Sequence, residues 1–156
     1  MDCDREKLLS YSLKILNRKD YTTSEIREKL LKRCDDEILV RDIISKLISL
    51  DLLNDRRYVE NYIGFKVERG WGPEKIKYEL IRRGILESEI EKSLKEKYPQ
   101  QLIKENIERN LKNWIRKNGE ISDRKKLDRL FKYLFRLGFD TQDILDILSN
   151  FSFHQE

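Results

Sequence analysis

Four basic residues toward the C-terminal end of this 156-residue chain have the spacing of one helix face. Lys125, Arg129, Lys132 and Arg136 are separated by four, three and four positions, so a helix would place them in one stripe. A stripe of cations neutralises phosphates and releases counterions, which predicts salt-sensitive binding to nucleic acid of any sequence. A solvated helix face is the competing interpretation, and the spacing alone leaves both open.

A second set of cations flanks a turn in the middle of the chain. Its members are Arg69, Lys75, Lys77, Arg82 and Arg83. Trp71 lies in this turn between Gly70 and Gly72, where its ring could pack over a junction or anchor a partner or a base. Most other aromatic residues, Tyr62 and Phe135 among them, fall at helical periods and are predicted to belong to the core.

Residue types that support catalysis are not grouped in this sequence. The single histidine, His154, is two residues from the end, where chain termini fray. There is no glycine loop for phosphate and no histidine and cysteine cluster with the spacing of a metal site. Carboxylates alternate with cations at helix-surface spacing, as Glu25 does with Lys29. We therefore expect no enzyme, no cofactor and no bound metal.

Composition favours thin helical units over one deep core. Charged residues make up 40% of the chain and hydrophobic residues 38%, and there are only two prolines and six glycines. The net charge of +4 permits nucleic-acid contact without proving it. Cys3 and Cys34 are predicted to be free thiols in a reducing cytosol. No apolar run has the length of a signal peptide or of a membrane span, so we expect a cytoplasmic protein without membrane contact.

The elements that must position the cations are predicted to be helices. In residues 4–18 the inward residues are expected to be Leu8, Leu9, Leu13 and Leu16, and in later helices they include Leu127 and Leu145. Thr22 with Glu25, and Ser88 with Glu91, have the spacing of capping boxes.

The stretch from Leu53 to Gly84 is predicted to be two helices joined by a tight turn. Asn54 or Asp55 can cap the first helix. Gly70 can take the left-handed conformation that ends this helix, and Pro73 suits the first position of the next.

Three positions repeat with a period of about 50 residues, which is typical of stacked supersecondary units. The corresponding residues are Ile26, Ile76 and Leu130, then Leu30, Leu80 and Leu134, then Cys34, Gly84 and Gly138. We therefore predict an all-α fold of three tandem three-helix repeats in an elongated, curved array. The predicted units are 1–53, 54–98 and 99–156.

The central stretch resembles the RecX family of bacterial regulators of the RecA recombinase. The matching residues are Leu53-Asn54-Asp55, Arg57-Tyr58-Val59, Arg69-Gly70-Trp71-Gly72-Pro73 with Ile76 and Leu80, and Arg83-Gly84-Ile85. No single motif is highly specific, but their order and spacing together are, and the three-unit plan agrees. The chain departs from this plan at Cys34, where the other units have glycine, and at Leu137, where a basic residue is frequent.

The resemblance implies a non-enzymatic monomer that binds the RecA filament on single-stranded DNA. It implies inhibition of the ATPase and recombinase activities of RecA, and thereby regulation of DNA repair and of the SOS response. Contact with single-stranded DNA would be weak or made through RecA. The basic residues named above, from Arg69 to Arg136, would be the contact residues.

The alternative is a helical protein that binds DNA or RNA on its own. The helix pair predicted within residues 55–83 could place a helix in a major groove. Such a protein would bind duplex with sequence preference, whereas a RecA regulator would depend on the filament.

Overall fold

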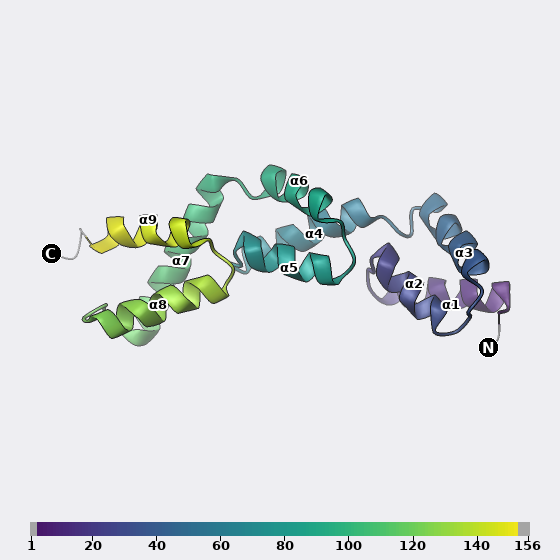
Figure 1. Ribbon diagram of the computed structural model, residues 1–156, viewed down its shortest axis with the longest axis horizontal. Coiled ribbons are helices and arrows are strands. Elements are labelled where there is room, and N and C mark those ends of the chain that lie inside the picture. The colour runs from purple at the N-terminus through teal and green to yellow at the C-terminus, as the bar shows by residue number, and fades with distance from the viewer. Residues whose placement is uncertain (1–2, 153–156) are drawn as a thin grey trace.

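The computed structural model describes residues 3–152, and over that range the protein consists of helices and connecting turns with no strand (Figure 1). The helices are α1 (Arg5–Arg18), α2 (Thr23–Leu31), α3 (Glu37–Ser49), α4 (Asp55–Glu68), α5 (Pro73–Arg82), α6 (Glu87–Lys97), α7 (Gln100–Asn118), α8 (Arg124–Arg136) and α9 (Thr141–Ser152). The predicted all-α class is confirmed.

The helices associate in three consecutive triplets, α1–α3, α4–α6 and α7–α9. The most extensive helix–helix contacts all fall within a triplet. Figure 1 shows the triplets following one another along the length of an elongated molecule, with α1 and α9 at opposite ends. The result is the helical repeat array that the sequence predicts.

The second helices of the triplets meet end to end. At one junction the Glu74 amide, at the start of α5, donates to the Gly138 carbonyl just after α8 (2.9 Å). At the other, the Thr22 hydroxyl, which caps α2, donates to the Arg83 carbonyl just after α5 (2.7 Å). In this arrangement α8, α5 and α2 are aligned head to tail (Figure 1), so the negative end of one helix dipole faces the positive end of the next.

The repeated glycines are required by these junctions. Gly84 and Gly138 have φ values of +85° and +100°, and a Cβ on either would overlap a residue of the adjoining helix start, Ser24 or Lys75. In the first triplet the corresponding residue is Cys34, which does not have a positive φ. It differs from the other two because, within residues 3–152, no second helix of a neighbouring triplet begins there.

The apolar residues form two separate cores. One lies within the first triplet and includes Leu8, Ile26 and Leu47. The other runs without interruption through the second and third triplets, from Val59 to Leu148. The array therefore contains one independent unit and one double unit.

Several residues predicted to be inward are exposed. They are Leu13, Leu127, Phe135 and Leu145. Each lies beside the apolar stripe of its helix, and the thin triplets bury only the centre of that stripe, such as Leu8 in α1 or Leu130 and Leu134 in α8.

The predicted caps are confirmed in two cases and wrong in one. Thr22 and Glu25 exchange both hydrogen bonds of a capping box (3.1 and 2.9 Å). Asn54 rather than Asp55 caps α4. Ser88 does not cap α6, because this helix already begins at Glu87 and places Ser88 inside its first turn.

Cys3 and Cys34 are joined in a disulfide, so the expectation of free thiols is wrong. Their Cα atoms are 5.0 Å apart, because the start of α1 meets the connection between α2 and α3. The 31-residue separation carries no sign of this proximity.

His154 lies outside the described residues. Across residues 3–152, none of the helices combines the length and the apolar character that crossing a membrane requires.

Candidate nucleic-acid interface

The turn between α4 and α5 holds Trp71 in a defined place. The Trp71 amide donates to the Lys66 carbonyl (2.9 Å), which closes the end of α4. The Trp71 carbonyl accepts a hydrogen bond from the Tyr98 hydroxyl (2.7 Å). The side chain is half-buried and packs against the larger core, so Trp71 both fills the junction and presents part of its ring to solvent.

Two lysines lie over the Trp71 ring. The ammonium nitrogens of Lys66, from the last turn of α4, and Lys75, from the first turn of α5, are 4.1 and 3.9 Å from the ring centroid. Both are within the range of cation–π attraction. Lys66 also lies 5.4 Å from the centroid of Tyr62, one turn earlier in α4.

Arg83 joins the same face from the end of α5. Its guanidinium carbon is 4.6 Å from the Tyr62 centroid, and the group donates to the Tyr58 hydroxyl (2.6 Å). The Tyr58 and Tyr62 rings are stacked with centroids 6.2 Å apart. We call Tyr62, Lys66, Arg69, Trp71, Lys75 and Arg83 the Trp71 cluster.

The cations of the Trp71 cluster repel one another. Burial, and then the charges of Arg69, Arg83 and Lys75, lower the pKa of Lys66 below its usual 10.5, which Glu79 only partly opposes. Among the described residues, none of these four cations forms an ion pair with a carboxylate. An anion placed on this face would therefore relieve existing repulsion.

Two other predicted contact residues, Lys77 and Arg82, lie beside carboxylates of the protein itself. The Lys77 ammonium lies 2.8 Å from a Glu87 oxygen and 2.9 Å from a Glu91 oxygen, and these two hydrogen bonds raise its pKa. Arg82 is exposed and lies 3.5 Å from Glu79. The structure thus brings Arg69, Lys75 and Arg83 together and places Lys77 on the side of α5 that faces α6.

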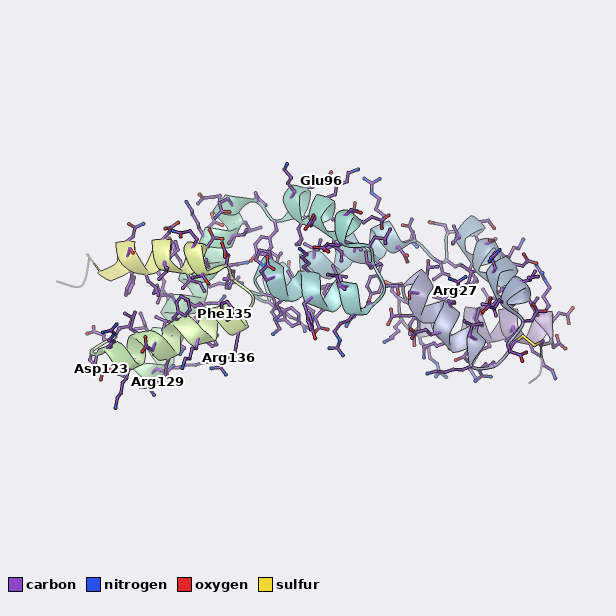
Figure 2. The ribbon with its side chains drawn as sticks, viewed as in Figure 1. Arg27, Glu96, Asp123, Arg129, Phe135 and Arg136 are labelled. Carbon is purple, nitrogen blue, oxygen red and sulfur yellow. A yellow bond between two sulfur atoms is a disulfide. The ribbon has the colours of Figure 1, made fainter. Side chains whose placement is uncertain are left out.

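The remaining predicted contact residues form an exposed row on α8. Lys125, Arg129, Lys132 and Arg136 are all exposed, and Figure 2 shows Arg129 and Arg136 projecting from the same side of the helix. The row leads toward the end of α8, where Gly138 lies against Lys75 of the Trp71 cluster.

Lys66 and the two tyrosines are members of this face that the sequence analysis missed. The signal was present, because Tyr58, Tyr62 and Lys66 are spaced four apart and lie on one side of a helix. Tyr62 is buried in the core, as predicted, yet its ring still contacts two cations.

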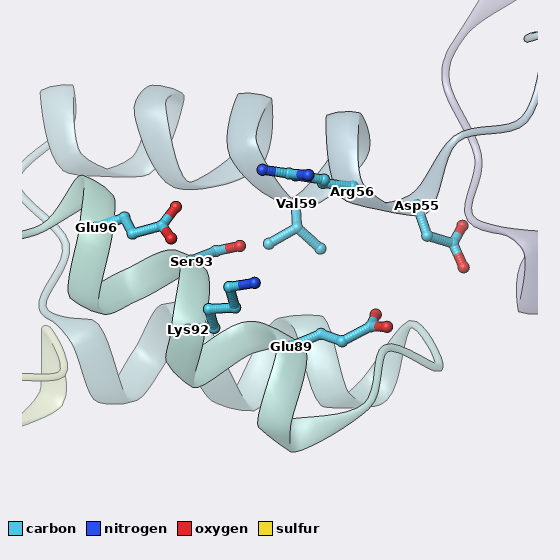
Figure 3. Close-up of a pocket in the computed structure, with 7 residues that line it drawn as sticks. All are labelled: Asp55, Arg56, Val59, Glu89, Lys92, Ser93 and Glu96. Carbon is cyan, nitrogen blue, oxygen red and sulfur yellow. The ribbon is translucent and has the colours of Figure 1, made fainter.

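A pocket of about 260 Å³ lies on another side of the second triplet, between α4 and α6. Figure 3 shows Arg56 and Asp55 from α4 opposite Glu89, Lys92 and Glu96 from α6, around Val59. Three carboxylates and two cations line this pocket, so it has no excess of positive charge. The Trp71 cluster is the stronger candidate for an anionic partner.

Known proteins resemble this chain in sequence and in fold. A family model described as RecX, second three-helix domain, matches residues 54–94. The Regulatory protein RecX of Mannheimia succiniciproducens is 28% identical over 90% of this chain and 92% of its own length. That of Halorhodospira halophila is 28% identical over 89% of this chain and 84% of its own length.

A solved structure agrees over nearly the whole array. The crystal structure of RecX from Lactobacillus salivarius has a TM-score of 0.85 and 27% sequence identity, and the match covers 96% of this chain and 97% of that chain. The domain match, the relatives and the structural neighbour agree with one another and with the central motif, and in sequence and fold the chain resembles the RecX regulatory proteins.

Proposed function

We propose that this protein binds the RecA filament on single-stranded DNA and restrains its ATPase and recombinase activities without being an enzyme itself. The similarity to RecX regulatory proteins in sequence and fold supports this proposal. The observation that carries it is the Trp71 cluster, where four cations have no carboxylate partner and three of them, Lys66, Lys75 and Arg83, lie against aromatic rings. Phosphates pair with such cations, and the solvent-exposed part of the Trp71 ring offers a contact to an unpaired base.

The elongated array suits a partner that is itself extended. The helices α8, α5 and α2 lie in one line, so the row on α8 and the Trp71 cluster follow each other along the molecule (Figure 1). We propose that units 1–53, 54–98 and 99–156 lie successively along the filament groove as a monomer. Regulation of DNA repair and of the SOS response in the cytoplasm would follow from that binding.

Sequence-specific reading of duplex DNA by the α4–α5 pair is less favoured. A recognition helix presents its N-terminal residues to base edges in the major groove. The start of α5 is instead occupied, because the Gly72 and Glu74 amides donate to the Leu137 and Gly138 carbonyls (2.7 and 2.9 Å). Access of this helix to a groove would require the junction to open.

The decisive experiment titrates the single-stranded-DNA-dependent ATPase of the same organism's RecA with this protein at fixed salt. We expect inhibition by the native protein and about tenfold weaker inhibition by the double variant Lys66→Gln with Arg69→Gln. The control, Lys95→Gln with Lys97→Gln, removes the same charge from α6 and should inhibit as the native protein does. Absence of any effect on RecA, together with tight duplex binding, would overturn the proposal in favour of a stand-alone nucleic-acid-binding protein.

The row on α8 is tested separately. Arg129→Glu with Lys132→Glu reverses two exposed charges and should weaken filament binding while leaving the melting temperature unchanged. Lys104→Glu with Lys112→Glu makes the same change on α7 and serves as the control. If the α8 double variant binds the filament as tightly as the α7 control does, the α8 row is only a solvated face.

A further inference from the structure

The first triplet repeats the contact between arginine and tyrosine that marks the Trp71 cluster. The Arg33 guanidinium carbon lies 3.6 Å from the centroid of the Tyr11 ring, as Arg83 lies 4.6 Å from that of Tyr62. Each arginine follows the second helix of its triplet, and each tyrosine comes from the first helix. In two successive triplets, therefore, an arginine that follows the second helix lies against a tyrosine ring of the first helix.

An open groove surrounds this second pair. It has a volume of about 640 Å³, and its charged lining residues are Glu6, Lys7, Lys14, Arg18 and Arg33. Four cations thus face one carboxylate, unlike the pocket between α4 and α6, where three carboxylates face two cations. Among the described residues, Arg33 forms no ion pair with a carboxylate.

The end-to-end arrangement of α5 and α2 sets the spacing of the two sites. The Arg83 carbonyl accepts from Thr22 at the start of α2, and Arg33 lies just beyond the end of the same helix. The two arginines are separated by the nine residues of α2 and by one or two further residues at each end. At a rise of 1.5 Å per helical residue, the distance between them is roughly 15–20 Å. One extended strand can reach both.

We infer that the groove at Tyr11 and Arg33 is a second binding site for single-stranded nucleic acid, entered by a strand that is already held at the Trp71 cluster. This inference rests on the proposed function. A guanidinium pairs with a phosphate in two-pronged geometry, and a tyrosine ring stacks on a base of any type. Once the first site is occupied, binding at the second is intramolecular and gains from a high effective concentration.

The test measures binding of fluorescent oligothymidines of two lengths, about 3 and about 20 nucleotides, by anisotropy at several salt concentrations. For Arg33→Ala we expect a three- to tenfold weaker affinity for the long strand and a salt dependence reduced by about one charge. The short strand spans only one site, so its affinity should change less than twofold. Arg41→Ala, which removes the same charge from the exposed face of α3, should bind both strands as the native protein does.

Two further variants keep the result interpretable. Tyr11→Phe retains the ring and should retain binding, which separates stacking from any role of the hydroxyl. If Lys66→Gln with Arg69→Gln weakens long-strand binding while Arg33→Ala matches Arg41→Ala, the second site is refuted and the proposed function stands. If the native protein binds neither strand and leaves RecA unaffected, both proposals fail.

Discussion

The two junctions of the array share one geometry but differ in how they are held together. Between the second and third triplets, backbone hydrogen bonds from Gly72 and Glu74 are joined by a continuous apolar core. Two buried asparagines of α7 add to it, because Asn106 and Asn110 donate to the Val67 and Gly70 carbonyls (3.1 and 2.9 Å).

The junction between the first and second triplets depends on polar side chains. The Thr22 hydroxyl donates to the Arg83 carbonyl, and the Thr23 amide donates to an Asp55 carboxylate oxygen (2.8 Å), while the two cores remain separate. In a repeat protein, stability is a sum of unit and interface contributions. The comparison therefore indicates that the second and third triplets unfold together and the first unfolds on its own.

The largest effect should come from Gly72→Ala. The φ of Gly72 is −81°, which any residue adopts, but a Cβ there would overlap the Gly138 carbonyl and the Phe139 amide nitrogen. Since backbone atoms on both sides cannot move independently, we expect a loss on the order of 3–5 kcal/mol in the unfolding free energy of the double unit. Chemical denaturation followed by Trp71 and Trp114 fluorescence measures it. A loss below about 1 kcal/mol would contradict the tight junction.

Cys3→Ser should come next and should affect only the first triplet. Opening a loop of about 30 residues costs about 3 kcal/mol through the entropy of the unfolded chain. Hydrogen exchange resolves the two units, and we expect faster exchange in α1–α3 with no change in α4–α9. The matched control is a pair of measurements under reductant, where the native protein and the variant should agree. Equal acceleration along the whole array would show that the units are not independent.

Gly84→Val should destabilise the weaker junction by about 1–3 kcal/mol, because a side chain at this positive φ is strained and also overlaps Ser24. Ser24→Gly in the same protein removes the overlap and should recover part of the loss, leaving the backbone strain. Thermal unfolding of both variants provides the measurement. An unchanged melting temperature for Gly84→Val would refute the role of this residue at the helix end.

Tyr98→Phe should give the smallest effect, about 1 kcal/mol at neutral pH, from loss of the hydrogen bonds to Trp71 and Asn106. Burial raises the pKa of Tyr98 from 10 to about 12. The unfolded chain therefore ionises first, and the contribution of Tyr98 to stability is present below pH 10 and is lost as pH rises to 12. The difference between the native protein and the variant should shrink over this window in pH-dependent denaturation, and a constant difference would contradict the assignment.

The sequence predicts the helices well because their signals are local. The capping box at Thr22, the left-handed Gly70 and the initial Pro73 each depend on neighbours within a few residues, and each is observed. Exposed positions such as Leu127 were mispredicted because helical periodicity reports which residues share a face and not how wide a face the neighbours cover.

The candidate site was predicted only in part for a related reason. Charge counting identifies Arg69, Lys75 and Arg83, but it cannot separate them from Lys77, whose carboxylate partners come from α6. The disulfide between Cys3 and Cys34 likewise depends on how helices pack, which their spacing does not encode. Long-range pairing is the information that a single sequence lacks.

The close approach of Gly72 to Gly138 has a consequence for how such sequences diverge. Because each of these glycines lacks a Cβ, it leaves room for backbone or Cβ atoms from across the junction. The overlap caused by a larger residue at one position is therefore not relieved by any substitution at the other. Gly84 instead faces the side chain of Ser24, so a smaller residue at position 24 can relieve the steric overlap of a larger residue at position 84. Among relatives of this protein, the first pair should be invariant, whereas a small residue at position 24 should accompany any replacement of Gly84, which backbone strain keeps infrequent, so that an alignment would distinguish the two junctions.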